Sequence, residues 1–188
     1  MGYVGDAGVF LVDTIFGFYI VILLLRILLQ LVRANFFNPV CQFIVKITNP
    51  PLVPLRKVIP NWGRLDLSAV LLAWLVKLVS LLIIVSMVGA AISPARLVGL
   101  SAVSLIDLTL VIFMAVVFIK VLLSWVAPGG DSPIHPLLYQ LSAPVMDPAR
   151  RLVPPMGGLD LSPMVVLLVL QLSRMLLVRP LTDLVNSL

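Results

Sequence analysis

The stretch Asp147–Pro163 reads DPARRLVPPMGGLDLSP and lies between two long apolar runs. An earlier stretch, Val53–Ala69, reads VPLRKVIPNWGRLDLSA and aligns with it at a shift of 94 residues, half of the 188-residue chain. The recurring positions are Pro54, Arg56, Pro60, Gly63, Leu65, Asp66, Leu67 and Ser68, which return as Pro148, Arg150, Pro154, Gly157, Leu159, Asp160, Leu161 and Ser162. The sequence therefore indicates one unit written twice, as residues 1–94 and 95–188.

The composition of the chain indicates a membrane protein. Hydrophobic residues make up 61% of it, charged residues 11%, and the mean hydropathy is +1.18. An ordinary soluble domain is about 45–50% apolar and about 25% charged, so too few charges are present to cover a water-exposed surface. The single cysteine, Cys41, excludes an intrachain disulfide and a multi-cysteine metal site.

Four apolar runs are long enough to cross the hydrocarbon core, which takes about 20 helical residues. They cover about 9–32 and 67–92 in the first unit, and about 97–126 and 161–178 in the second. We therefore expect an all-α protein with two spans in each unit. Two spans return the chain to its starting side, so the two units run parallel, and we expect a pseudo-two-fold axis along the membrane normal.

A short amphipathic segment follows the first span of each unit, at 38–48 and 132–141. Each begins with a residue suited to capping a helix, Asn38 or Ser132, followed by a proline suited to the first turn. Apolar residues then recur at helical spacing: Val40, Phe43, Ile44 and Ile47 in the first unit, and Ile134, Leu137, Leu138 and Leu141 in the second. Both segments are too short to span, so we expect interfacial helices. Packing against the protein's own bundle is the alternative.

The basic residues predict the orientation in the membrane. Nine of the 13 Lys and Arg lie on or near the two motif loops, at 50–68 and 144–162. These nine are Arg26, Arg33, Lys46, Arg56, Lys57, Arg64, Lys120, Arg150 and Arg151. By the positive-inside rule, the motif loops are cytoplasmic and both termini lie outside. The predicted location is the inner membrane of a bacterium.

Each motif loop carries an arginine and an aspartate on opposite sides of a turn. The pair in one loop could close that loop as a clamp, or the arginines could bind lipid phosphates or acidic groups of a partner. In the second loop we expect a short helix over 148–153, a turn at Gly157-Gly158, and Ser162 as the cap of the last span. The candidate motif residues are Pro54, Arg56, Pro60, Gly63, Asp66, Ser68, Pro148, Arg150, Arg151, Pro154, Gly157, Gly158, Asp160, Ser162 and Pro163.

Charges inside the predicted spans form a second candidate site, since ionisable groups there are costly and are often functional. They are Asp13, Lys77, Asp107 and Arg174. Asp107 is placed to pair with Arg174. Such pairs could lock the helices together or line an ion pathway. Arg26 lies near the end of the first span, where its side chain could reach the headgroups.

No residues form a recognisable enzyme site. The only histidine, His135, lacks a Cys or Glu at ligand spacing. Gly157-Gly158 lacks the Lys and Ser of a phosphate-binding loop. We therefore expect neither catalysis nor a cofactor.

The tandem P-x-x-x-P-x-R and G-x-L-D-x-S pattern, each copy leading into a span, resembles the YggT family of small bacterial membrane proteins, related to YlmG proteins. The second copy carries the full PARRLVPPMGGLDLSP form, whereas in the first copy Arg64 replaces the second glycine and Ala69 the last proline. The resemblance implies roles in osmotic tolerance and ion uptake or in membrane-complex assembly, and it carries over no catalytic residue.

Two functions remain open from the sequence. One is a non-catalytic accessory or scaffold protein whose basic motif face contacts anionic headgroups or partner proteins. The other is a small ion channel or transporter. In either case we expect a homo-oligomer or a subunit of a membrane complex, without nucleic acid as a partner.

Overall fold

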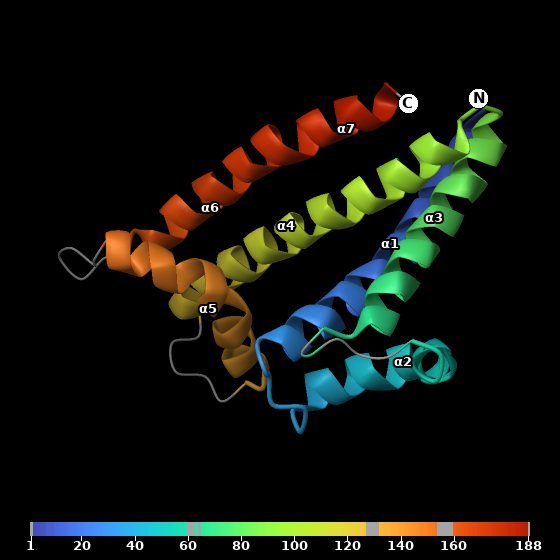
Figure 1. Ribbon diagram of the computed structural model, residues 1–188. Coiled ribbons are helices and arrows are strands. Elements are labelled where there is room, and N and C mark those ends of the chain that lie inside the picture. The colour runs from blue at the N-terminus through green and yellow to red at the C-terminus, as the bar shows by residue number, and fades with distance from the viewer. Residues whose placement is uncertain (1, 60–62, 64, 127–131, 154–159, 188) are drawn as a thin grey trace.

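A computed structural model describes residues 2–59, 63, 65–126, 132–153 and 160–187. These residues form helices with no strand among them (Figure 1). The helices are α1 Tyr3–Leu31, α2 Pro39–Arg56, α3 Leu67–Val88, α4 Pro94–Val126, α5 Ile134–Leu152, α6 Ser162–Ser173, the π-helical turn η1 Arg174–Val178, and α7 Arg179–Asn186.

Four helices are long and apolar enough to cross a membrane: α1, α3, α4 and the composite helix Ser162–Asn186. The all-helical, multi-pass architecture expected from the sequence is thus present, but the helix ends differ. α1 begins at Tyr3 instead of near residue 9. α3 ends at Val88 instead of residue 92, because Gly89 takes a left-handed conformation (φ 70°) that ends the helix.

The last span is longer than the predicted 161–178. The helix continues through Arg179-Pro180, and α7 ends at Asn186. Pro180 cannot donate a backbone hydrogen bond. The wide turn η1 directly precedes α7, and Pro180 sits in the first turn of α7, where the missing donor is tolerated.

The amphipathic helices also run further than the predicted 38–48 and 132–141, and no separate helix forms over 148–153. Asn38 caps α2 as expected, accepting from the Val40 amide at 2.9 Å. Both helices then continue through prolines, of which Pro50, Pro54, Pro144 and Pro148 are exposed. Each helix also keeps a buried stripe, which includes Ile44, Thr48 and Leu52 in α2 and Leu141, Met146 and Ala149 in α5. Burial of these stripes offsets the hydrogen bonds lost at the prolines.

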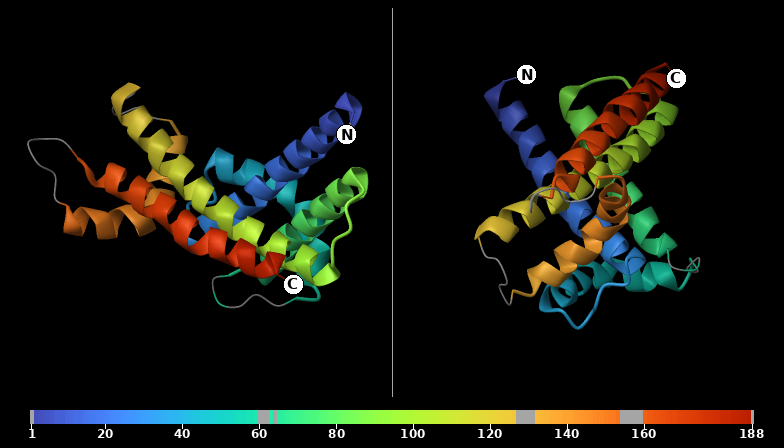
Figure 2. Two further views of the ribbon diagram at one scale, coloured as in Figure 1. Left: turned by 90° about the horizontal axis from the view of Figure 1, so that it is seen from above. Right: turned by 90° about the vertical axis from the view of Figure 1, so that its left-hand side faces the viewer.

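Each unit packs its two spans side by side and places its amphipathic helix at one end. α1 packs along α3, and α4 packs along α6, η1 and α7. α2 and α5 lie at one end of the bundle, while both chain termini lie at the other (Figures 1 and 2). The motif segments that follow α2 and α5 therefore begin at the same end.

The contacts between the units do not follow the expected two-fold axis. α3 packs on α4, and a two-fold axis would require α1 to pack equally on the composite helix α6–α7. No comparable contact occurs between them in the described ranges. The reason is the connection: only residues 89–93 join α3 to α4, which makes these two helices neighbours.

Candidate functional site

The first motif loop is closed by an ion pair whose aspartate is buried and whose arginine is partly exposed. Arg56, at the end of α2, donates to Asp66 Oδ2 from Nε at 3.0 Å and also from Nη2. Asp66 precedes α3 and caps it, because Oδ1 accepts from the Ala69 amide at 3.2 Å. Asp66 is only 1% exposed. One carboxylate thus joins the end of α2 to the start of α3.

The second loop repeats this pairing in a more open setting. Arg150 donates to Asp160 Oδ2 from Nε at 3.2 Å and Nη2 at 3.0 Å. The side chains of Arg150 and Asp160 are 37% and 35% exposed. Burial raises the pKa of Asp160, but hydrogen bonds from Ser162 and Arg150 outweigh it, so the net pKa is below its ordinary value. The stability that this carboxylate contributes is present above its unfolded pKa and is lost as the pH falls through the lower folded value.

A serine fastens each loop a second time. Ser68 Oγ donates to the Ile59 carbonyl at 3.2 Å, and Ser162 Oγ donates to the Val153 carbonyl at 3.1 Å. Ser162 was expected to cap the last span, but its hydroxyl is engaged with Val153, and Asp160 accepts from the Ser162 amide instead at 3.0 Å. The serines therefore tie the end of the amphipathic segment to the start of the following span.

The remaining motif residues divide into three groups. Pro54 and Pro148 lie on the exposed sides of α2 and α5, and Arg151 is exposed beside Arg150. Gly63 has a φ of 59°, a left-handed conformation that favours glycine, and Pro163 starts α6. Pro60, Pro154, Gly157 and Gly158 lie outside the described residues, as does Arg64.

A cation near the end of the first span of each unit holds the amphipathic helix. Arg26 donates to the Thr48 hydroxyl and to the Val45 carbonyl at 3.4 Å, and it is 4% exposed. The expectation that Arg26 reaches the headgroups is therefore wrong, because α2 covers it and supplies its acceptors. Lys120 donates to Ser142 at 2.8 Å. Both pairs are separated by 22 residues.

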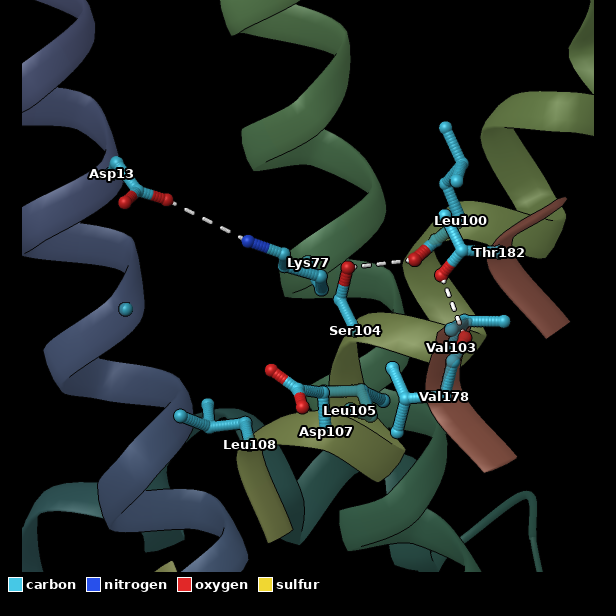
Figure 3. A pocket seen from close by; sticks show the side chains of 11 residues that line it. Asp13, Lys77, Leu100, Val103, Ser104, Leu105, Asp107, Leu108, Val178 and Thr182 are labelled. Atoms are coloured by element: carbon cyan, nitrogen blue, oxygen red, sulfur yellow. Dashed lines mark hydrogen bonds and ion pairs between the residues drawn. The ribbon is translucent and has the colours of Figure 1, made fainter. Parts of the chain in front are cut away.

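Three of the four charges inside the spans line one cavity between the two units, and the fourth, Arg174, is bonded to one of the three. The cavity, about 370 Å³, is lined by Asp13, Lys77 and Asp107 together with Ser104 and Thr182 (Figure 3). They come from α1, α3, α4 and α7. The site thus exists only where the two units meet.

Two ion pairs flank this cavity. Arg174 donates to both oxygens of Asp107, from Nε at 2.6 Å and Nη2 at 2.9 Å, as the sequence predicted. Lys77 Nζ lies 3.6 Å from Asp13 Oδ1, a pair that the sequence analysis missed. The Lys77 side chain is 17% exposed and that of Asp13 is 62% exposed. Asp13 therefore keeps accessible acceptor capacity at the cavity.

The repeat could have revealed part of what was missed. Asp13 and Asp107 are equivalent positions at the shift of 94. Because a cation was expected to pair with Asp107, a cation could also have been expected to pair with Asp13. The cations are not equivalent, however, because Lys77 aligns with Gln171 and Arg174 with Ser80. Arg174 lies three residues beyond Gln171, about one turn along the helix. The alignment of Thr48 with Ser142 was the available signal for the hydroxyl acceptors.

The described residues contain no group of three or more His, Cys, Asp or Glu side chains that could hold a metal ion. The arrangement consists of four ion pairs among the described residues. Two of them close the motif loops, and two border the cavity. Such groups can bind ions and polar headgroups or hold helices in register.

The sequence model of the CCB3/YggT family matches the chain twice, over residues 6–87 and 100–181. The chain belongs to the CCB3/YggT family. The two matches are offset by 94 residues, the same shift that relates the motif loops, so the family unit is present twice.

Relatives match over most of both chains. An uncharacterized protein of Pseudomonas aeruginosa is 41% identical over 174 residues, 92% of this chain and 88% of the relative. A protein encoded in the region 3′ of proC in Vibrio alginolyticus is 41% identical over 170 residues, 89% and 91% of the two chains. YggT of Escherichia coli K12 is 37% identical over 166 residues, 88% and 86%. No solved structure matches the chain significantly.

Proposed function

We propose that this protein is a non-catalytic accessory or scaffold protein of the bacterial inner membrane, which supports envelope or osmotic-stress adaptation or membrane-complex assembly. The observation that carries the proposal is the pair of clamped loops: an arginine and an aspartate ten residues apart close the loop in both units. A clamp that fixes backbone geometry at two equivalent places suits a docking surface.

The docking surface is a basic platform, made of the two motif loops with α2 and α5 lying in the interface. Support comes from their common end of the bundle (Figure 1) and from exposed cations there, including Lys46, Lys57 and Arg151. Each cation near an anionic membrane surface contributes about 1 kcal/mol of attraction. The platform would engage anionic headgroups and the acidic surface of a partner.

The platform is expected to face the cytoplasm, with both termini outside. A reporter that is active only in the cytoplasm should be silent when fused after Leu188. The same reporter inserted at the solvent-exposed Lys57 should be active, because that position belongs to the platform. A reporter that is active after Leu188 and inactive at residue 57 would show that the orientation is the opposite one.

The proposed assembly is a homo-oligomer or a larger membrane complex. Its support is the one-sided packing between the units: α3 covers α4, whereas α1 has no comparable contact with α6–α7 across the described part of the chain. Phe10, Ile15 and Phe18 on α1 are exposed. A second copy or another membrane protein could cover this face.

Purification in a mild detergent tests the scaffold function directly. We expect light scattering or native mass spectrometry to detect an oligomer or a stoichiometric complex, and Arg56→Ala to weaken it by unfastening the first loop. Lys57→Ala removes a neighbouring cation of the platform and leaves the clamp in place, so it separates the effect of the clamp from the effect of charge. A partner-free monomer that passes ions when reconstituted alone would contradict the scaffold proposal.

The alternative function, ion passage, has one observation in its favour. The cavity between the units is bordered by Asp13, Lys77 and Asp107 and lies among helices that are long enough to span. Asp107 is engaged by Arg174 on both oxygens, so Asp13 is the carboxylate with acceptor capacity to spare. Ion flux in liposomes that is lost in Asp13→Asn would favour this alternative over the scaffold.

A further inference from the structure

A second cavity, about 480 Å³, lies within the second unit between α4, α5 and α6. Its charged lining consists of Lys120, Arg150 and Asp160. The other lining residues are mostly apolar and come from α4, α5 and the start of the last span. They are Val117, Val121, Trp125, Met146, Leu161, Pro163 and Met164, with Ser124. The lining is therefore amphipathic, with a charged part and an apolar part.

The charged part has a surplus of donors. Asp160 Oδ2 accepts from Arg150, and Oδ1 accepts from the Ser162 amide, so the carboxylate is already engaged. Arg150 donates to it through Nε and Nη2, and a guanidinium has five N–H donors in all. Lys120 donates to Ser142 and lies 4.6 Å from the centre of the Tyr139 ring. An ammonium carries three donors, so both cations have donors left for an anion.

The apolar part lies where an acyl chain would lie. Lys120 is six residues from the end of α4, about 9 Å along the helix, so the charges sit near the end of the span and not at its centre. Trp125 is exposed beside the cavity, and tryptophan favours the membrane–water interface. An amphiphile with a negative head and an apolar tail matches both parts of the lining.

The first unit supplies an internal comparison. Arg26, which aligns with Lys120, is 4% exposed and is bound to Thr48 and the Val45 carbonyl of α2. Asp66, which aligns with Asp160, is buried as well. In the second unit the aligned groups are more exposed and border the cavity. The aligned charged side chains are therefore buried in the first unit and accessible from a cavity in the second.

We infer that this cavity binds one anionic phospholipid, with the headgroup phosphate on Lys120 and Arg150 and an acyl chain along Val121 and Met164. The chemistry is charge-assisted hydrogen bonding from an ammonium and a guanidinium to phosphate oxygens. The inference rests on the lipid-contact part of the proposed function and gives it a defined site in one unit. It does not require a partner protein.

Quenching of Trp125 fluorescence tests the site. In Trp62→Phe/Trp74→Phe, Trp125 is the sole tryptophan. We expect phosphatidylglycerol with brominated acyl chains to quench it at lower mole fractions than brominated phosphatidylcholine in nanodiscs. Lys120→Gln should reduce this preference about five-fold, because one cation near an anionic surface contributes about 1 kcal/mol of attraction. Arg179→Gln, which removes an exposed cation of α7 outside the platform, should leave it unchanged.

One further variant and one competition experiment test the apolar wall and the identity of the ligand. Val121→Phe narrows the apolar wall without changing the charge and should also reduce the preference. Inorganic phosphate at matched concentration should not displace the brominated phosphatidylglycerol. Equal quenching by the two lipids, or a Lys120→Gln variant that equals the parent, would overturn the site. Displacement by inorganic phosphate would overturn the assignment to a phospholipid. The search for a partner by co-purification is independent of all these outcomes.

Discussion

Arg56→Ala is expected to lower the free energy of unfolding by about 3 kcal/mol, whereas Arg150→Ala should lower it by about 1 kcal/mol or less. Removing one member of a buried ion pair costs about 3–5 kcal/mol, because the other charge is left buried and unpaired. In Arg56→Ala, Asp66 would be the charge left buried and unpaired, since it is 1% exposed. An exposed pair is typically worth about 0–1 kcal/mol, and both members of the Arg150–Asp160 pair are more than one-third exposed at their side chains.

The measurement is equilibrium unfolding in mixed micelles of a mild detergent and dodecyl sulfate, followed by circular dichroism. Lys57→Ala is the matched control, because Lys57 is an exposed cation directly beside Arg56. Equal losses in the two arginine variants would show that burial of the aspartate does not set the strength of the clamp.

Arg174→Leu and Asp107→Leu are each expected to lower the free energy of unfolding by about 2.5–3.5 kcal/mol, the cost of a single charge within a spanning helix. Each substitution removes one side of a bidentate pair and leaves the other side without its counter-charge. The double variant removes both charges and should recover most of the loss, since apolar replacement of a whole ion pair is often neutral.

The same unfolding assay gives the coupling energy from the four proteins of the cycle. A double variant whose loss equals the sum of the single losses would mean that Asp107 and Arg174 act separately. The pair Asp13–Lys77 should couple more weakly, because its Nζ–Oδ1 distance is 3.6 Å and the Asp13 side chain is 62% exposed.

Local patterns in the sequence were sufficient for the helices and the duplication. A span needs only a long apolar run, and the shift of 94 residues follows from comparing the chain with itself. The Asp107–Arg174 pair also followed, because each charge is costly in a membrane unless it finds the other. The helix ends were less accurate where prolines occurred. The energy that carries α2 through Pro50, and the last span through Pro180, comes from packing and from a π-helical turn.

Only the tertiary structure decided which groups meet across helices. Arg26 looked free to reach the headgroups, but α2 folds over it and supplies Thr48 as an acceptor. Asp13 and Lys77 come together because α1 packs along α3, and the cavity beside them exists because α4 also packs against α3. Periodicity reports which face of one helix is apolar, whereas the rotation and tilt of that helix against its neighbours depend on side-chain packing throughout the bundle. The two units therefore share a sequence pattern and yet differ in which charges they bury.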